Sequence, residues 1–168
     1  MAFSLLADEE VDRITELEPQ WFLQRRIRLI LLDIDNTIVA YTESEPSREF
    51  LRWTERLKEA GIGCMIVSNS RKSRRVPDFG EKWSIGYIRK AGKPSPKGLY
   101  RAMGEMGCRP EETAMAGDQT FTDILAGNLE GVTSILVRPI RFSNPFQVIR
   151  YGIELPFIRM ARRKRKRS

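Results

Sequence analysis

The sequence predicts an α/β fold, a doubly wound parallel sheet flanked by helices on both faces. Apolar runs that suit strands alternate with amphipathic segments that suit helices, in units of about 30 residues. The apolar runs are continuous, which is typical of strands buried on both faces of a parallel sheet. Several end in a polar residue, at the edge where open α/β sheets carry their sites. At 168 residues, one domain with a substantial core is expected.

The first third of the chain predicts a helix, a buried strand and a second helix. A short amphipathic helix is expected over residues 8–17, with Asp8 as its N-cap and Pro19 ending it. RLILLDI (28–34) is a continuous apolar run and predicts a strand. Residues 46–61 open with proline, close on glycine and predict a helix.

The rest of the chain continues the alternation. The remaining predicted strands are 62–68, 84–88, 113–118 and 132–137, and the remaining predicted helices are 95–107 and 121–131. We therefore expect a single domain over residues 1–145, with its motifs within 28–137, followed by an apolar and basic extension over 146–168.

The composition excludes several classes of enzyme. The chain has no histidine, which removes Ser-His-Asp hydrolases, histidine-phosphate enzymes and His-ligated zinc sites. Cys64 and Cys108 form no CxxC pair, and neither is followed by an arginine six residues later, so a cysteine zinc site and a cysteine phosphatase are not expected. Catalysis must then use carboxylates, Lys, Ser or Thr, or a metal held by oxygen ligands.

Targeting signals are not evident in the sequence. The stretch MAFSLLADEE lacks the basic region of a secretory signal, and no segment approaches the roughly 20 apolar residues of a transmembrane helix. With only two cysteines, a reduced cytoplasmic protein is expected.

The net charge of +7 is unevenly distributed. Residues 138–168 hold ten Lys and Arg and one acid, so this segment carries +9 and residues 1–137 carry −2. Such a basic end can lie on an anionic bilayer, bind nucleic acid, or remain a solvated tail. Residues 145–160 mix large apolar residues with charges, which suits either a membrane contact or packing on the core.

Two aspartates, Asp33 and Asp35, stand at the end of the predicted strand 28–34. Alternation along an extended chain puts them on the same side, where they repel one another. A divalent cation that prefers oxygen ligands, such as Mg²⁺, would offset this repulsion. A carboxylate can also attack phosphorus, and a second acid can protonate the leaving oxygen and activate water. The structural alternative is a capping turn before a helix.

Other polar residues lie at or after further predicted strands. Asp118 and Asp123 in GDQTFTD can complete a metal site, although Asp123 also suits the first turn of a helix. Ser68 can bind a phosphoryl oxygen or cap a loop. Lys93, in a loop with two prolines, can neutralise phosphoryl charge, with Lys97 as the competing candidate.

Together these motifs resemble those of the haloacid dehalogenase (HAD) superfamily of aspartate-nucleophile phosphatases. The four matching motifs, in the same order as in the superfamily, are LLDIDNT (31–37), MIVS (65–68), KPSP (93–96) and GDQTFTD (117–123). The resemblance covers residues 28–137 and implies a Rossmann-like HAD core.

The resemblance also implies a role for each matching residue. Asp33 would be the nucleophile and Asp35 the general acid and base, and the aspartate at position 35 implies a phosphatase rather than a dehalogenase. The phosphate-binding residues would be Thr37, which also supports the first loop, Ser68, Asn69 and Lys93. The Mg²⁺ ligands would be Asp33, Asp35 through its backbone carbonyl, Asp118 and, in a supporting position, Asp123.

The intervals between the motifs bear on the substrate. Residues 38–67 and 69–92 leave no room for the folded cap domain that many members of the superfamily carry, so the site is expected to be open to a large substrate. The capless shape, the details DIDNT and GDQ, and the basic C-terminus are similar to subfamily IIIA of the YqeG type. That resemblance implies a phosphatidylglycerophosphate phosphatase that produces phosphatidylglycerol.

Three hypotheses of function follow. The first is a Mg²⁺-dependent phosphomonoesterase that acts on a phospholipid headgroup at an anionic membrane, which would place the protein peripherally on the inner face of the cytoplasmic membrane. The second is a HAD phosphatase for phosphoprotein or nucleic-acid ends, with the basic tail as a polyanion tether. The third is a non-enzymatic adaptor that binds nucleic acid or membrane.

Overall fold

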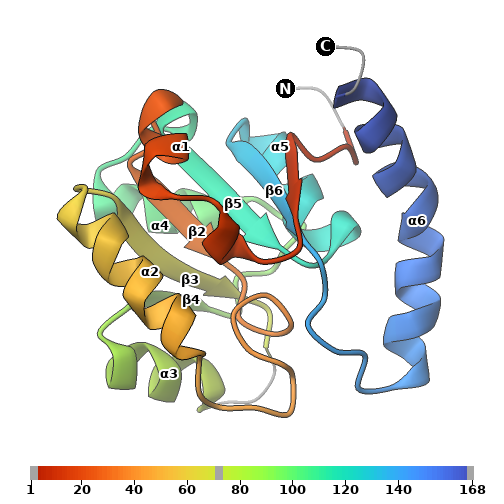
Figure 1. The fold of residues 1–168 in the computed structure, drawn as a ribbon, viewed down its shortest axis with the longest axis horizontal. Coiled ribbons are helices and arrows are strands. Elements are labelled where there is room, and N and C mark those ends of the chain that lie inside the picture. The colour runs from red at the N-terminus through yellow and green to blue at the C-terminus, as the bar shows by residue number, and fades with distance from the viewer. Residues whose placement is uncertain (1–3, 71–73, 166–168) are drawn as a thin grey trace.

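The computed structural model describes residues 4–70 and 74–165. Six strands form one sheet in the order β1-β6-β5-β2-β3-β4, and every pairing is parallel (Figure 1). The strands are β1 (Glu9–Val11), β2 (Leu29–Leu32), β3 (Gly63–Ser68), β4 (Gly86–Arg89), β5 (Thr113–Gly117) and β6 (Thr133–Val137). The predicted α/β class with a parallel sheet is confirmed.

Helices cover both faces of this sheet. One face carries α1 (Pro19–Gln24), α2 (Arg48–Glu59) and α3 (Arg75–Trp83), and the other carries α4 (Lys97–Met106) and α5 (Leu125–Glu130). The four residues of β2 are fully buried because they alternate between these two layers. This explains why the strand reads as an unbroken apolar run.

The expected boundaries of most elements lie within a few residues of the observed ones. Helix α2 begins after Ser47, whose Oγ accepts a hydrogen bond from the Phe50 amide at 3.1 Å. It ends just before Gly61, which has a φ of 76°. The helix predicted over 121–131 is present as a π-helical turn, η3 (Thr120–Ile124), that continues into α5.

The helix predicted over residues 8–17 is wrong. Residues Glu9–Val11 form strand β1, and only Ile14–Glu16 form a short 3₁₀ turn. The segment lies at the open edge of β6, where the Arg138 amide donates a hydrogen bond to the Val11 carbonyl at 3.0 Å. Backbone pairing at this edge outweighs the local helical pattern.

Asp8 and Pro19 also act differently from the prediction. Instead of capping a helix, the Asp8 carboxylate accepts a hydrogen bond from the Ser134 amide at 2.9 Å, next to the β1–β6 pairing. Pro19 occupies the first position of α1 rather than ending a helix, a place where its missing N–H costs nothing.

The expectation that no cap domain is present is confirmed for the described part of the chain. The interval after the first motif holds α2 and β3, and the interval after the second motif holds α3 and β4. All of these elements belong to the sheet or to its helical layers (Figure 1).

The longest helix, α6 (Pro145–Arg165), stands beside the β1–β6 edge of the sheet (Figure 1). Its buried residue Ile158 packs with Ile124 and Leu136, and the Phe157 and Phe121 rings meet edge to face at 5.6 Å. Part of the C-terminal segment is therefore packed on the body of the protein.

Residues 166–168 at the end of the basic C-terminal segment lie outside the described residues, as do the basic and polar residues 71–73. Arg162 of the tail pairs with Glu10 of β1 at 2.6 Å. Across the helices that the structure describes, we find no stretch with the length and apolarity needed to cross a bilayer.

Candidate active site

The site lies at the carboxyl ends of the three central strands. Leu32 of β2 is paired with Ile66 of β3 on one side and with Ala116 of β5 on the other. The next residues along these strands therefore meet at one edge of the sheet, and the Asp33 amide donates to the Ala116 carbonyl at 2.9 Å. Parallel pairing thus places residues that are far apart in sequence around a single point.

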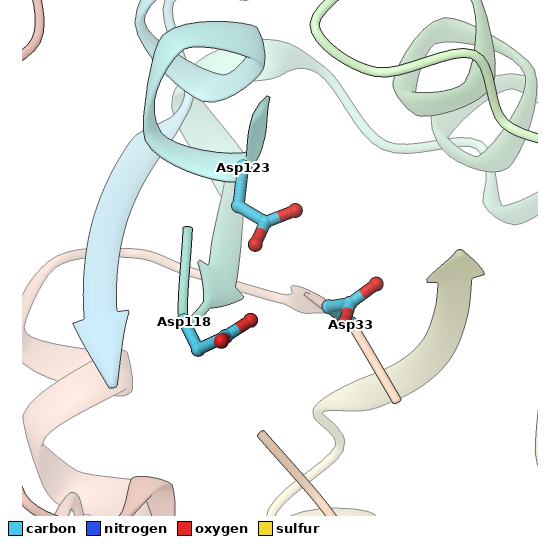
Figure 2. Close-up of side chains that lie close together, drawn as sticks. All are labelled: Asp33, Asp118 and Asp123. Carbon is cyan, nitrogen blue, oxygen red and sulfur yellow. The ribbon is translucent and has the colours of Figure 1, made fainter. Parts of the chain in front are cut away.

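Three buried carboxylates meet at this edge. One oxygen from each of Asp33, Asp118 and Asp123 lies within 4.8 Å of the other two, and Figure 2 shows the three side chains around a common space. Asp33 follows β2, Asp118 follows β5, and Asp123 lies in η3. The Asp118 Oδ1 atom is buried without a hydrogen-bond partner among the described residues.

The electrostatics of this cluster favour a bound cation. Burial raises the pKa of Asp118 well above its usual value, and the charges of Asp123 and Asp33 raise it further, whereas Arg150 lowers it. Burial likewise raises the pKa of Asp123 to about 6, although Lys93 opposes the shift. Three clustered carboxylate oxygens suit a hard divalent cation such as Mg²⁺. Asp118 Oδ1, which no described residue hydrogen-bonds, is available as one of its ligands.

Lys93 lies between two of these carboxylates. Its Nζ is 2.8 Å from Asp33 Oδ1 and 2.7 Å from Asp123 Oδ1, and it donates a third bond to the Val67 carbonyl at 2.6 Å. Burial lowers the pKa of this lysine, but the two carboxylates outweigh burial and the net shift is upward. The ammonium is therefore charged, and it compensates part of the negative charge of the cluster.

The competing lysine, Lys97, is exposed at the start of α4. The structure therefore brings Lys93, and not Lys97, together with the carboxylates.

Asn69 fixes the loop that carries Lys93. Its side-chain amide donates to the Lys93 carbonyl at 2.7 Å and its side-chain oxygen accepts from the Lys93 amide at 2.9 Å. Ser68, almost fully buried at the end of β3, accepts a hydrogen bond from the Ser70 amide at 3.1 Å. Ser68 and Asn69 both line the cavity that contains Asp33, as their predicted phosphate-binding role requires.

Asp35 lies apart from the carboxylate cluster and is held by an arginine. Its Oδ1 accepts a hydrogen bond from Arg75 Nε at 2.6 Å, and the other guanidinium nitrogens bond the Glu43 and Ala40 carbonyls at 2.7 and 3.1 Å. Arg75, the first residue of α3, therefore ties the loop after β2 to α3. The Asp35 carboxylate is not one of the three clustered carboxylates.

Thr37 is buried in the loop after Asp35, and its hydroxyl has no hydrogen-bond partner among the described residues. It lines a neighbouring cavity with Ile38, Val39 and Phe50, beside the one that contains Asp33. This position fits support of the first loop better than direct contact with phosphate.

The cavity above Asp33 has a volume of about 230 Å³ and receives two residues from α6. Arg150 lines it and donates through one of its terminal nitrogens to Asp118 Oδ2 at 3.0 Å. Gln147, one helical turn earlier, lines it as well. The C-terminal helix therefore forms one wall of the site.

Glu154 holds that helix against the site. It is fully buried, one turn after Arg150, and its carboxylate accepts a hydrogen bond from the Phe121 amide of η3 at 3.5 Å. Burial raises its pKa, and the Arg150 charge lowers it.

Four residues at or near the site were not predicted from the sequence: Arg75, Gln147, Arg150 and Glu154. Arg75 lies outside the four motifs. The spacing of Gln147, Arg150, Glu154 and Ile158 at three or four residues was a helical signal within residues 145–160, but their contact with the site depends on a turn after β6 that local patterns do not encode.

The fold and this site define a class of protein. Residues 23–131 match the family model described as "Hydrolase: haloacid dehalogenase-like hydrolase", and the chain belongs to that family. It is 38% identical over 141 residues to "Probable phosphatase YqeG" of Bacillus subtilis (strain 168), an alignment that covers 84% of this chain and 81% of that protein. The protein is accordingly a phosphatase, and the adaptor hypothesis is excluded.

Solved structures support the fold. A subfamily III A hydrolase from Legionella pneumophila matches 88% of this chain and 93% of its own, at 15% identity and a TM-score of 0.51. The 3-deoxy-D-manno-octulosonate 8-phosphate phosphatase of Moraxella catarrhalis, in complex with magnesium, phosphate and its sugar, matches 83% and 93% at 14% identity and a TM-score of 0.50.

Proposed function

We propose that the protein is a Mg²⁺-dependent phosphomonoesterase that removes the terminal phosphate of phosphatidylglycerophosphate, with Asp33 as nucleophile. The observation that carries the lipid assignment is the position of α6. This helix lines the cavity that contains Asp33 with one side and exposes an apolar stripe on another.

Asp33 is placed to attack phosphorus. In the proposed reaction one Asp33 oxygen bonds to phosphorus while the bond from phosphorus to the glycerol oxygen breaks. Lys93, 2.8 Å from Asp33, supplies positive charge next to the transferred group. The product of this half-reaction is an aspartyl phosphate and a free alcohol.

Asp35 is the proposed proton carrier. It protonates the departing glycerol oxygen and later takes a proton from the water that attacks the aspartyl phosphate, which releases inorganic phosphate and regenerates Asp33. Arg75 holds the Asp35 carboxylate in place at 2.6 Å. Such an ion pair orients the carboxylate before substrate binds.

The cluster Asp33, Asp118 and Asp123 fits a divalent cation, and Asp118 Oδ1, which no described residue hydrogen-bonds, is available to it as a ligand atom. We assign Mg²⁺ to Asp33, Asp118 and the Asp35 backbone carbonyl, with Asp123 in support. When bound, Mg²⁺ supplies positive charge that stabilises the transferring phosphoryl group.

The apolar stripe of α6 consists of Phe146, Ile149, Ile153 and Met160, which recur at helical spacing. Their side chains are between 53% and 74% exposed. Exposed apolar residues at this density are characteristic of a binding surface, and the neighbouring Arg159 and Arg163 favour an anionic one. This α6 stripe supports a contact with acyl chains or with an anionic bilayer next to the site.

We further propose that the protein works in the cytoplasm, peripherally on the inner face of the membrane. Its basic C-terminal segment then adds to the attraction of the α6 stripe for anionic lipid, at about 1 kcal/mol for each cation near the surface. Because Arg162 is paired with Glu10, this contribution falls to other cations of the segment.

The test is phosphate release from phosphatidylglycerophosphate in mixed micelles, measured beside a phosphopeptide, 3′-phosphorylated DNA and sugar phosphates. We expect the highest kcat/KM for the lipid, and loss of activity with a chelator and its return with Mg²⁺. Comparable or higher rates on the soluble substrates would reject the lipid assignment. A preference for the phosphopeptide or DNA would favour a phosphatase of macromolecular ends.

A further inference from the structure

Arg150 is the cation that α6 brings into the active-site cavity. Among the described residues that line this cavity, it is the only positively charged one, and its side chain is 18% exposed. It comes from the C-terminal helix, outside the four motifs that mark the catalytic residues. Arg150 therefore adds a cation at the wall of the cavity, whereas Lys93 lies inside the carboxylate cluster.

The guanidinium of Arg150 is only partly engaged. One terminal nitrogen bonds Asp118 Oδ2 at 3.0 Å, whereas Nε is buried and has no hydrogen-bond partner among the described residues. A guanidinium carries five N–H donors in a fixed planar arrangement that suits two oxygens of a phosphate. The bond to Asp118 fixes the orientation of this group while donors remain for an anion.

The position of Arg150 on its helix decides which anion it meets. Arg150 is four residues after Phe146 and three before Ile153, both in the α6 stripe, and four before the buried Glu154. Residues at these spacings are neighbours on a helix surface. Arg150 therefore lies between the exposed apolar stripe and the buried side of α6 that adjoins Asp118.

We propose that Arg150, assisted by the Gln147 amide, binds a second anionic group of the substrate, the phosphodiester between the lipid anchor and the terminal phosphate. This inference rests on the proposed function. The order on the protein is the α6 stripe, Arg150 and the carboxylate cluster, and the order along such a lipid is acyl chains, phosphodiester and phosphomonoester. The match makes Arg150 a specificity residue for substrates that carry two phosphates.

The experiment separates binding from turnover by using the Asp33→Asn variant, in which the nucleophile is absent. Calorimetric titrations in Mg²⁺ buffer compare glycerophosphoglycerophosphate, the deacylated headgroup with both phosphates, with glycerol 3-phosphate, which has only the monoester. We expect Arg150→Gln in the Asp33→Asn background to weaken binding of the first ligand by at least about 10-fold, the effect of a lost charge-assisted hydrogen bond. Binding of the second ligand should change by less than about threefold.

The control is Arg52→Gln, which removes an exposed arginine of α2 and should leave both affinities unchanged. Arg150→Lys keeps a charge near Asp118 but loses the planar fork, so it should recover part of the affinity for the two-phosphate ligand only. Equal losses for the two ligands, or none for either, would overturn the proposal and leave Arg150 as a structural partner of Asp118.

The same measurements distinguish failure of the proposed function. If the wild type releases no phosphate from the lipid but Arg150 still discriminates between the two headgroups, the inference stands and the lipid assignment fails. If the lipid is hydrolysed and Arg150→Gln lowers kcat/KM by the same factor on the lipid and on p-nitrophenyl phosphate, the inference fails and the assignment stands.

Discussion

Asp33 lies among charged groups that interact with its negative charge. Lys93 contacts it directly, and Asp118 and Asp123 share its cation site. The Asp33 carboxylate thus pairs with Lys93 and is also the proposed nucleophile. A substitution at this position can separate the structural role from the catalytic one.

Asp33→Asn should lower kcat on any phosphomonoester by at least about 1000-fold, because the amide cannot form the aspartyl phosphate. Thermal unfolding should remain cooperative, since the amide still accepts a hydrogen bond from Lys93. Phosphate release with p-nitrophenyl phosphate measures the first quantity and circular dichroism the second. A folded variant that keeps more than a tenth of the activity would show that another residue is the nucleophile.

Gly117 is required by the approach of Asp123. A Cβ at this position would overlap the Asp123 carboxylate, so the end of β5 and η3 can meet only if residue 117 has no side chain. Gly117→Ala should therefore displace Asp123 and lower both Mg²⁺ affinity and kcat/KM by at least about 10-fold.

The matched control is Gly104→Ala in α4, where an added Cβ would contact nothing. Helix propensity predicts a gain of about 0.5–1 kcal/mol in the free energy of unfolding for this change, with no effect on activity. A Gly117→Ala enzyme with wild-type Mg²⁺ dependence would contradict the role given to Asp123.

At the scale of elements, α6 combines three functions that usually belong to separate segments. It is anchored to η3 through Glu154, lines the site through Arg150, and exposes the α6 stripe. If the membrane surface itself covers the site, no cap domain is needed to enclose the substrate.

The double substitution Ile149→Gln and Ile153→Gln should weaken binding to vesicles of phosphatidylglycerol and phosphatidylcholine by at least about 10-fold, because each apolar side chain gains about 1.5–3 kcal/mol on burial. Hydrolysis of p-nitrophenyl phosphate should be unchanged, since both residues are exposed. Flotation of the vesicles measures the first effect.

Tyr100→Gln serves as the comparison, because Tyr100 is an exposed apolar residue on α4. It should bind vesicles like the wild type. Equal losses for the two variants would indicate a general effect of hydrophobicity and remove the α6 stripe as the membrane contact.

The elements show which features of the fold can be read from the sequence. The central strands and α2 follow from continuous apolar runs and from their capping residues, because burial on both faces and helix ends leave local signals. Strand β1 could not be read in this way, since Glu9–Val11 extends only because the β6 edge is available to it. The catalytic motifs were predictable because they follow strands that leave such local signals. Arg150 was missed because its contact with the site, like the pairing of β1, depends on a distant part of the chain.

At the scale of the whole molecule, the site stores negative charge that the fold must compensate. Burial raises the pKa of Asp118, and it raises that of Asp123 to about 6. Because the folded-state pKa of Asp123 lies above that of an unfolded chain, the metal-free protein loses stability as pH rises from about 4 through 6. The raised pKa of Asp118 adds to this loss in the same direction. A bound cation removes this repulsion.

Addition of Mg²⁺ should therefore raise the melting temperature, and more at pH 7.5 than at pH 5, because protons compete with the cation for Asp123 below about pH 6. At a Mg²⁺ concentration 100 times the dissociation constant, the free energy of unfolding should rise by about 2.7 kcal/mol. Differential scanning fluorimetry with Mg²⁺ or a chelator at the two pH values measures it. A larger rise in melting temperature with Mg²⁺ at pH 5 than at pH 7.5 would refute the cation site.

The pairing of β1 with β6 has a consequence for how the protein is made. Residues 9–11 leave the ribosome long before residues 133–137, so β1 has no partner until β6 is made, and one edge of β6 is unpaired until β1 joins it. An unpaired, largely apolar edge is a template for another chain. By pairing with the β6 edge, the few residues of β1 protect the protein from aggregation. A fusion partner placed directly before β1 should hinder this pairing and lower the yield of soluble protein.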